Sequence, residues 1–432
     1  MKKTVIYWVS RAIRIHENPA LFYAQELALR EKMDLLCVFN LYPAFPFANT
    51  RNMDFLLKGL AEMAGKLKQY KIPLLLVEGE AKKTFVSLMA EYDVATIVTE
   101  HQVLKPVLRA QDDVRALCGS KGISLQTVNT ACVVDVRFAS PKCEFSAKTF
   151  RPKIMGQYRN HLTKLPEVTK HPQAIMKRSF TSSDVQEILD THTEWPKLSL
   201  SSLVPGEDAG LTRLSEFIEN GLSNYDRRNE VDAGGQSMLS AYLHFGMISP
   251  VRMIREVEAT GHPNAPLFVE EAMVRRELAE NFCHYCKEYD SLDGAWDWAK
   301  TSLLRHRDDA RPYTYDYETF AKAKTHDPLW NYCQRRVVKD GYLHSYLRMY
   351  WAKMVLLWTI DAQSAVQILI RLNDTYFLDG RDPNGYCGIL WSVAGLHDRP
   401  WFDKPIHGLI RAMGKEGTLR KTKLDLNQIS EE

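Results

Sequence analysis

Short apolar runs alternate with longer amphipathic segments along the first 130 residues. The runs are rich in β-branched residues, as buried strands are. They span residues 5–9, 35–39, 73–77, 94–99 and 123–128. Residues 20–29 and 53–67, which lie between runs, repeat apolar positions at helical spacing. The alternation predicts a parallel α/β sheet with right-handed crossovers, a fold shared by too many unrelated proteins to name a ligand.

The pattern changes after residue 170. Residues 171–210 are polar and rich in serine, threonine and proline, which is typical of a connecting segment on a protein surface. Beyond them the periodicity is mostly helical. It is strongest over residues 236–247, 268–285, 342–360 and 364–372. We therefore predict an α/β domain over residues 1–170, a connecting segment over residues 171–210 and an all-helical domain over residues 211–432.

Composition is that of an ordinary globular chain, with 432 residues, 45% of them hydrophobic and 25% charged. Eight cysteines without framework spacing indicate reduced thiols and hence an intracellular protein, in either the cytoplasm or the nucleus. The apolar start is interrupted by Ser10, Arg11 and Arg14, so it fits a first strand better than a signal peptide. No apolar stretch reaches the roughly 18 residues that a membrane span needs.

Two segments near the C-terminus are the most specific feature of the sequence. One is the helical run Leu347-Arg348-Met349-Tyr350-Trp351-Ala352-Lys353. The other begins Leu372-Asn373-Asp374, continues through Asp379-Gly380-Arg381-Asp382 and is followed by Trp391. Together they resemble the flavin-binding region of class II photolyases, light-driven enzymes that split cyclobutane pyrimidine dimers in DNA. The resemblance covers nearly the whole chain and is strongest over residues 325–420. It implies a Rossmann-like parallel α/β antenna domain followed by a helical FAD-binding domain.

Residues 234–246 begin with two glycines and a serine ahead of a helical pattern. Free backbone N–H groups at a helix start favour a phosphate, although the string alone is more typical of an ordinary helix cap. The resemblance implies that this is the loop that binds the flavin diphosphate. The cofactor residues assigned on that basis are Tyr225, Gln236, Ser237, Met238, Leu239, Ser240, Phe268, Arg348, Asn373 and Asp379.

Arg348 and Asp379 form a natural ion pair, because a buried arginine needs a carboxylate. The resemblance places this pair beside the isoalloxazine ring and Asn373 opposite the flavin N5, where an amide can accept or donate a hydrogen bond. Asn384 is the second choice for that role. The string around Asn384 also fits a plain turn.

Trp351 and Trp358 are seven residues apart, which puts them on one helix face at about 10.5 Å. Taken alone, tryptophans at this spacing are more typical of a helix core. The resemblance implies instead a relay that photoreduces an oxidised flavin. Trp351 is then nearest the flavin, Trp330 lies in the middle and Trp358 is the surface terminus.

Glu271 lies in a charged helical segment that alone would fit a solvated helix face. The resemblance implies that its carboxyl group contacts the damaged bases and stabilises the charge that develops on the dimer. Met349 and Trp391 then lie opposite, and the indole offers a face to a dimer flipped out of the duplex. Arg275 stands near a position where some photolyases carry a stacking tryptophan, and a guanidinium plane can also stack.

Basic residues dominate the C-terminal part of the chain. From Trp401 to Leu424, six Lys and Arg residues stand against two acidic ones, a net charge of +4. Such a segment fits either a phosphate-binding surface or a solvated basic tail. The resemblance implies that Arg399, Trp401 and Arg411 help to fill the gap that the extruded dimer leaves in the DNA.

Two further strings bear on cofactors. Cys283-His284-Tyr285-Cys286 lacks a second ligand pair at suitable spacing, so we expect no metal site. His16-Glu17-Asn18-Pro19 keeps part of the antenna pattern, with proline where relatives commonly carry tryptophan. The resemblance thus implies FAD and leaves open a second, antenna chromophore of the deazaflavin or folate type.

The function expected from the sequence is light-dependent repair of DNA by a flavoprotein lyase. The expected partner is UV-damaged DNA, double- or single-stranded, bound by a monomer that needs no membrane and no obligate protein partner. A cryptochrome-like blue-light photoreceptor without repair activity is the main alternative. A DNA-binding or nucleotide-binding protein without light chemistry is a third.

Overall fold

The computed structural model describes residues 2–172, 175 and 177–425. The chain divides into two compact units that interleave along the sequence. The first unit comprises residues 1–135, 158–215 and 238–259, and the second unit comprises residues 136–157, 216–237 and 260–432. The ranges expected from the sequence, by contrast, are contiguous.

Five parallel strands form the sheet of the first unit, in the order β3-β2-β1-β4-β5. Their bounds are β1 Lys3–Val9, β2 Asp34–Leu41, β3 Leu74–Glu78, β4 Asp93–Glu100 and β5 Ser124–Val128. Each predicted run overlaps one strand and starts no more than one residue before it, so the α/β prediction is confirmed. The central strand β1 is buried from Thr4 to Val9 because both faces of the sheet are covered, which explains its continuous apolar sequence.

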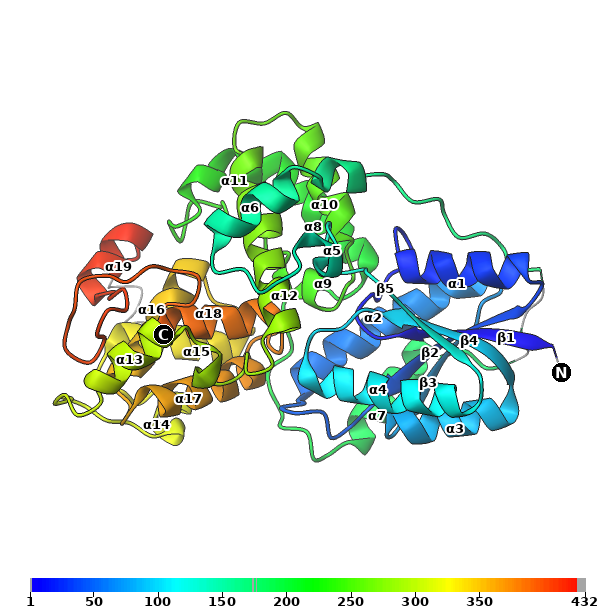
Figure 1. Ribbon diagram of the computed structural model, residues 1–432, viewed down its shortest axis with the longest axis horizontal. Helices are drawn as coiled ribbons and strands as arrows, with labels where there is room; N and C mark the ends of the chain where they lie inside the picture. The colour runs from blue at the N-terminus through cyan, green and yellow to red at the C-terminus, as the bar shows by residue number, and fades with distance from the viewer. Residues whose placement is uncertain (1, 173–174, 176, 426–432) are drawn as a thin grey trace. The chain divides into compact units, whose positions relative to one another are not determined.

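Helices cover both faces of this sheet (Figure 1). On one face, Phe85 of α3 packs against Trp8 of β1, with ring centroids 4.8 Å apart. The side chain of Asn18 caps α1 by accepting hydrogen bonds from the backbone N–H groups of Ala20 and Leu21. The helices of the first unit are α1 Pro19–Arg30, α2 Thr50–Gln69, α3 Ala81–Glu91, α4 Lys105–Ser120, α7 Ser182–Thr191, α8 Glu207–Glu216, α9 Ser240–His244 and α10 Pro250–Ala259, with a 3-10 turn at Tyr158–His161.

The described residues of the polar segment, 171–172, 175 and 177–210, belong to the first unit. The backbone N–H of His171 donates to the carbonyl of Tyr70, and the indole Nε1 of Trp195 donates to the carbonyl of Pro43 at 2.8 Å. Helix α7 packs against α2. The segment is therefore held by backbone hydrogen bonds as well as by one short helix.

Helices and short turns make up the second unit. Its helices are α5 Val136–Ala139, α6 Ala147–Met155, α11 Ala265–Val269, α12 Arg276–Tyr285, α13 Asp297–Arg305, α14 Tyr317–Ala321, α15 Pro328–Asp340, α16 Ser345–Leu357, α17 Ala362–Tyr376, α18 Pro383–Ala394 and α19 Lys415–Thr422. The turns are η2 Phe217–Gly221, η3 Leu222–Arg227, η4 Glu270–Arg275 and η5 Leu292–Gly294. Three of the four predicted helical segments are confirmed by α11 to α12, α16 and α17.

The fourth helical prediction, over residues 236–247, is wrong for its first half. Only Ser240–His244 is helical, and Ser237 therefore does not open a helix. Gly234 and Met238 adopt positive φ angles of 68° and 57°, in the left-handed region, which no α-helix can pass through. The apolar spacing in this stretch arises from packing of a loop.

Across the described ranges, no helix is long and apolar enough to cross a membrane. The same ranges hold no cluster of three or more His, Cys, Asp or Glu side chains that could bind a metal ion. All eight cysteines are free thiols.

Candidate functional site

Helix α16 and the segment that joins α17 to α18 meet in a network of polar side chains. Arg348 Nη1 lies 3.0 Å from Asp379 Oδ1, and Arg348 Nη2 donates to Asn373 Oδ1 at 2.5 Å. The ion pair is as predicted, although the Arg348 side chain is 26% exposed rather than buried. Its guanidinium also lies 3.8 Å from the centre of the Phe377 ring. The ion pair is thus fixed in place and partly exposed, so that it can both donate and accept hydrogen bonds.

Asn373 and Asn384 occupy different environments. Asn373 is buried, and its Nδ2 donates to Asp374 Oδ1 at 2.8 Å while its Oδ1 faces Arg348. Asn384 is exposed and its Nδ2 donates to Asp382 Oδ1 within the first turn of α18. A Cβ atom at Gly385 would lie 2.9 Å from Asn373 Nδ2, so glycine allows the Asn373 amide to approach that turn. The structure thus groups Asn373, and not Asn384, with Arg348 and Asp379.

An aromatic row begins beside this network. Trp351 lies 5.6 Å from Phe377, and its ring is stacked on Trp330 with centroids 6.2 Å apart and an interplanar angle of 9°. Trp330 donates from Nε1 to the carbonyl of Trp351, and Trp351 donates from Nε1 to Gln334 Oε1. Trp358 follows with its centroid 6.4 Å from that of Trp330. The three indoles therefore form one continuous row in the order expected from the sequence.

Trp358 is not the surface end of the row, because it is only 5% exposed. Its ring lies 4.7 Å from the His326 ring and 6.3 Å from the Tyr315 ring. His326 stacks on Tyr313 at 3.6 Å, and Tyr313 is 43% exposed. The prediction of a surface terminus at Trp358 is corrected: Tyr315 and His326, which lie in the loops on either side of α14, cover that indole, and Tyr313 carries the aromatic contacts to solvent.

Glu271 lies on η4, a single π-helical turn between α11 and α12. Such turns are frequent at functional sites because the extra residue re-aims neighbouring side chains. The carboxylate of Glu271 is 44% exposed and lies 3.4 Å from Arg228 Nη2. Glu270, on the same turn, is instead tied to Arg151 at 2.6 Å and to Arg275 at 3.0 Å. The turn thus fixes one carboxylate and leaves its neighbour accessible, while Arg275 is drawn toward Glu270.

Met349 and Trp391 lie on two helices that pack together, α16 and α18. Both side chains are partly exposed. Lys353, one turn after Met349, is buried and its Nζ lies 4.4 Å from the centre of the Trp391 ring. One face of the Trp391 indole is therefore covered by a cation that the sequence patterns did not single out.

The residues expected to bind a diphosphate are divided between the two units. Tyr225 is buried edge-on against Phe268 at 5.4 Å, and the guanidinium of Arg228 lies 5.1 Å from the Tyr225 ring centre. Gln236 donates to the carbonyl of Arg228 and accepts from the Tyr342 hydroxyl at 3.1 Å. These residues and Ser237 belong to the second unit. Met238, Leu239 and Ser240 are assigned to the first unit.

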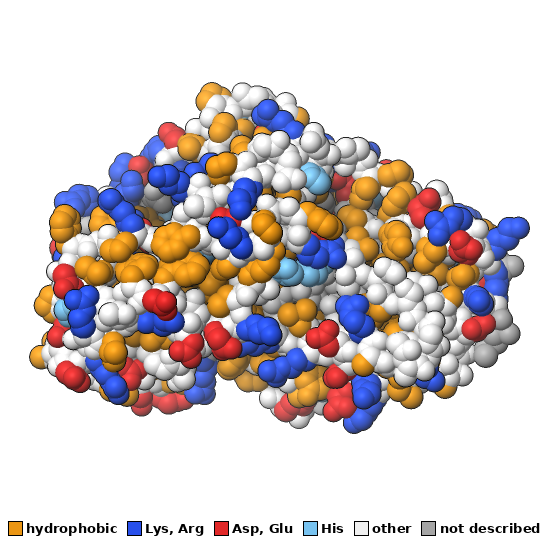
Figure 2. Space-filling model, in the orientation of Figure 1, with side chains coloured by type: hydrophobic (Ala, Val, Ile, Leu, Met, Phe, Trp, Pro, Cys, Tyr) orange, Lys and Arg blue, Asp and Glu red, His pale blue; other side chains and the backbone are white. Residues whose placement is uncertain are grey.

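Trp401 lies between two arginines. The guanidinium groups of Arg399 and Arg411 are each 5.0 Å from the Trp401 ring centre, and Trp401 Nε1 donates to Asp398 Oδ2 at 3.1 Å. Arg399 and Arg411 are exposed, as is Phe402 beside them. Figure 2 shows Lys and Arg side chains set among hydrophobic ones over the helices of the second unit. Alternating cationic and aromatic groups suit contacts with phosphates and unstacked bases.

Comparison with known proteins decides the family. The DNA photolyase model matches residues 5–172. A deoxyribodipyrimidine photo-lyase from Arabidopsis thaliana is 38% identical, over 98% of this chain and 87% of the relative. One from Potorous tridactylus is 39% identical, over 96% of this chain and 79% of the relative. The chain belongs to the DNA photolyase family. It is accordingly an enzyme of that family, whose members act on DNA.

Two further similar proteins are more distant. A chicken cryptochrome-2 is 26% identical over 79% of the photolyase-family chain and 61% of the relative. The solved structure of a bacterial class III photolyase from Agrobacterium tumefaciens has a TM-score of 0.78, at 16% identity, covering all of this chain and 86% of that one. This last similarity supports the fold, an α/β part joined to a helical part.

Membership of the photolyase family implies FAD, and the donor set of the second unit fits it. The isoalloxazine ring carries carbonyl and N–H groups along one edge, which require donors and acceptors in turn. Arg348, Asp379 and Asn373 supply a guanidinium, a carboxylate and an amide within one hydrogen-bonded group. The Trp351 row begins at Phe377, whose ring Arg348 also contacts. Tyr225 and Gln236 are the residues of this unit that would face the diphosphate.

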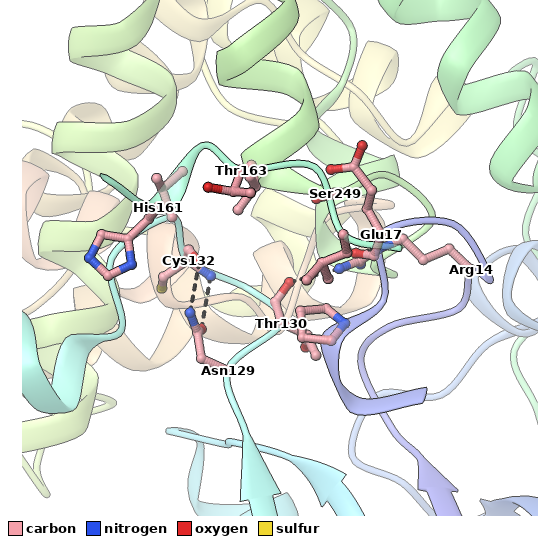
Figure 3. A pocket seen from close by; sticks show the side chains of 12 residues that line it. Arg14, Glu17, Asn129, Thr130, Cys132, His161, Thr163 and Ser249 are labelled. Atoms are coloured by element: carbon pink, nitrogen blue, oxygen red, sulfur yellow. Dashed lines mark hydrogen bonds between the residues drawn. The ribbon is translucent and has the colours of Figure 1, made fainter. Parts of the chain in front are cut away.

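The α/β unit of this photolyase-family chain contains a pocket of about 170 Å³, beyond the carboxyl ends of β1 and β5 (Figure 3). Such edges bind ligands in open α/β sheets. Glu17 and Pro19, from the antenna-like string, line it. Arg14 spans the wall and donates to the backbone carbonyls of Glu17, Thr130 and Gly246. The Arg14 guanidinium is thus committed to the protein itself, whereas the buried Thr130 Oγ1 has no partner.

Three features of the site were missed from the sequence. The π turn at Glu270–Arg275 has no sequence signature. His326 and Tyr313 lie in a loop, so helical spacing could not connect them to the tryptophans. Lys353 was visible as the one cation in the otherwise apolar run from Met349 to Trp358, which is itself a signal for a buried charge.

Proposed function

We propose that this protein repairs cyclobutane pyrimidine dimers in DNA under blue or near-UV light, as a class II photolyase. One observation carries the proposal: α16 presents three sets of groups at once. Arg348 joins the Asp379 and Asn373 network, and Trp351 starts the aromatic row. Met349 and Lys353 share a helix face one turn apart, and Lys353 contacts Trp391. A cofactor site, an electron path and a substrate face thus meet on one helix.

Reduced FAD, when bound, would supply the light chemistry, in which one electron is donated to the dimer and returned after the cyclobutane ring has split. The protein contributes binding and orientation. Arg348 holds Asn373 Oδ1 and Asp379, which fixes the amide that we assign to the flavin N5. With Oδ1 accepting from Arg348 and Nδ2 donating to Asp374, the amide is held in one orientation.

The substrate side of the proposal uses Trp391, Met349 and Glu271. A dimer flipped out of the duplex exposes the faces of its saturated pyrimidine rings, and the indole of Trp391 supplies an apolar surface that covers one of them. The accessible carboxyl group of Glu271 is placed to hydrogen-bond the damaged bases where negative charge develops. Arg275 then acts through Glu270 rather than as a stacking wall.

Flavin photoreduction is the proposed role of Trp351, Trp330 and Trp358. Centroid separations of 6.2 and 6.4 Å suit short stepwise transfers. From Trp358 the path reaches solvent through His326 and Tyr313, because the last indole is covered. This arrangement serves a photoreceptor as well as a repair enzyme, so it does not choose between them.

Repair is favoured over a cryptochrome-like photoreceptor by the relatives. Those at 38 and 39% identity over nearly the whole chain are named deoxyribodipyrimidine photo-lyase, whereas the chicken cryptochrome-2 shares 26% over a shorter span. The accessible Glu271 and the half-open Trp391 agree with a substrate site. An antenna chromophore of the deazaflavin or folate type is proposed for the first unit, where Glu17 and Pro19 line the pocket.

The test uses a single-stranded oligonucleotide that carries one thymine dimer. Purified protein with reduced FAD is illuminated with blue light or kept in darkness, and restored thymines are counted by chromatography. Restoration in light alone supports the proposal. Protein that holds stoichiometric FAD and photoreduces it, yet restores no thymines, is a photoreceptor. Protein that purifies without FAD contradicts both functions.

A further inference from the structure

Lys353 is a buried cation beneath an aromatic ring. Its side chain is 1% exposed, its Nζ donates to the carbonyl of Ser392 at 3.0 Å, and it lies 4.4 Å from the centre of the Trp391 ring. No carboxylate lies within 4.0 Å of Nζ among the residues described here. A buried ammonium without a carboxylate is rare, because desolvation is offset by few interactions. Because an unpaired buried ammonium does not favour folding, a functional role is expected for Lys353.

The surroundings make the charge of Lys353 sensitive to pH near neutrality. Burial lowers its pKa to about 7, while Asp398 opposes this change and Arg411 reinforces it. Asp398 is already engaged by Trp401 Nε1 and by the backbone N–H of Arg399. The nearby His407 has its pKa lowered by burial to about 4, so it stays neutral above pH 6. Among these neighbours, Lys353 is the group that changes charge between pH 6 and 8.5.

The contact with Trp391 divides the indole into two faces. A cation attracts the negative face of an aromatic ring, and the attraction is stronger where water is excluded. One face of Trp391 is occupied by Lys353, and the side chain is still partly exposed. The remaining exposed surface of the ring is therefore the surface available to a ligand that packs against the indole.

We propose that Lys353 is a positioning residue for Trp391: its ammonium holds the back of the indole, so that the front is presented to the pyrimidine dimer. The inference rests on the proposed repair function and adds a second determinant of lesion recognition to it. Lys353 does not contact the dimer. It limits the rotation of the Trp391 ring, which lowers the entropy lost when a dimer stacks on it.

A purely structural role of Lys353 predicts a different outcome. The Ser392 carbonyl lies in the last turn of α18, where backbone carbonyls lack helical partners and a cation is favourable. If Lys353 only caps this helix, replacing it lowers stability and leaves the preference for dimers unchanged in the folded fraction. If it positions Trp391, the preference falls, and stability is unchanged or rises because an unpaired buried charge is removed.

The experiment compares the wild-type FAD-loaded protein with Lys353→Met, which keeps the length of the side chain without its charge. The control is Lys322→Met, an exposed lysine that pairs with Glu318 on α14. Dissociation constants are measured in the dark for a dimer-containing oligonucleotide and for its undamaged twin, from pH 6 to 8.5. The ratio of the two constants removes effects on general phosphate binding. Thermal melting and FAD content are recorded for each variant.

The wild-type preference for the dimer is expected to fall as pH rises through about 7, the value to which burial lowers the Lys353 pKa. Lys353→Met is expected to show a preference about tenfold weaker at pH 6, or about 1.4 kcal/mol, and no pH dependence. A wild-type ratio that is flat from pH 6 to 8.5 overturns the inference even where the variant does not fold. So does a Lys353→Met ratio equal to that of Lys322→Met. A wild-type protein that repairs nothing and prefers no dimer overturns the repair function as well.

Discussion

The two units differ in how fully their charged side chains are hydrogen-bonded within the protein. In the first unit, the buried Arg14 donates to four backbone carbonyls. In the second unit, Lys353 makes one hydrogen bond and packs against one aromatic ring, and the Arg348 side chain is 26% exposed. Saturated polar groups specify a fold, whereas groups with unused capacity can bind. Arg14 of the α/β unit thus uses its donors internally, whereas Lys353 and Arg348 of the helical unit keep some capacity available.

The strongest test of this difference is Arg14→Met in the first unit. Removing the guanidinium leaves the carbonyls of Glu17, Thr130 and Gly246 without a buried donor. We expect the free energy of unfolding to fall by about 3–5 kcal/mol, measured by denaturant titration followed by circular dichroism. Arg30→Met, at an exposed pair with Glu31, is the control and should change stability by no more than about 0.5 kcal/mol. Equal effects would mean that Arg14 is not structural.

Glu100→Gln tests whether burial of charge in the first unit opposes folding. Burial raises the pKa of the Glu100 carboxyl to about 7, above its ordinary value. The folded state therefore binds more protons than the unfolded state between pH 4.5 and 7, so stability is lost as pH rises through that window. The neutral amide still accepts from Tyr7 and avoids this loss. Above pH 7 we expect Glu100→Gln to be more stable than wild type by up to about 3 kcal/mol, and about equal at pH 4.5. A difference that does not change with pH would contradict the assignment.

The sheet could be predicted from the sequence because its strands are buried on both faces. A run such as Val5 to Val9 has one structural solution in a chain with alternating helical segments. The loop around Met238 could not be predicted, since its apolar spacing imitates a helix and the left-handed residues that break it include a non-glycine. Local pattern identifies what is buried, and it does not show which way the backbone turns.

The site was predicted through resemblance more than through physics. The Arg348 and Asp379 pair followed from charge alone, but the row of tryptophans needed the family, because Trp330 comes from a different helix than Trp351. The burial of Trp358 was missed because loop residues supply its cover. Contacts between elements distant in sequence depend on tertiary packing, which periodicity does not encode.

Trp330→Phe sharpens the contrast within the second unit, by removing one member of the row that stacks on Trp351. We expect photoreduction of the oxidised flavin to slow by about 100-fold, or about 2.7 kcal/mol, while repair by chemically reduced protein is unchanged. The matched control is Trp195→Phe in the first unit, a buried indole whose Nε1 also donates to a backbone carbonyl at 2.8 Å. Flavin absorbance under steady illumination is the readout. Equal slowing in both variants would show a general effect of losing a buried tryptophan.

The smallest expected effect concerns the two neighbouring glutamates of the π turn. Glu270 is committed to ion pairs within the protein, whereas Glu271 is accessible. Glu271→Ala removes the accessible carboxylate, so we expect dimer splitting per absorbed photon to fall about tenfold, or about 1.4 kcal/mol, with melting temperature unchanged. Glu270→Ala removes the carboxylate that Arg151 and Arg275 share, so it should reduce stability by up to about 1 kcal/mol and leave splitting intact. Repair yields under reduced flavin and melting curves are measured on both. The reverse outcome, with Glu270→Ala losing repair, would mean that the ion-paired carboxylate is the one that meets the lesion.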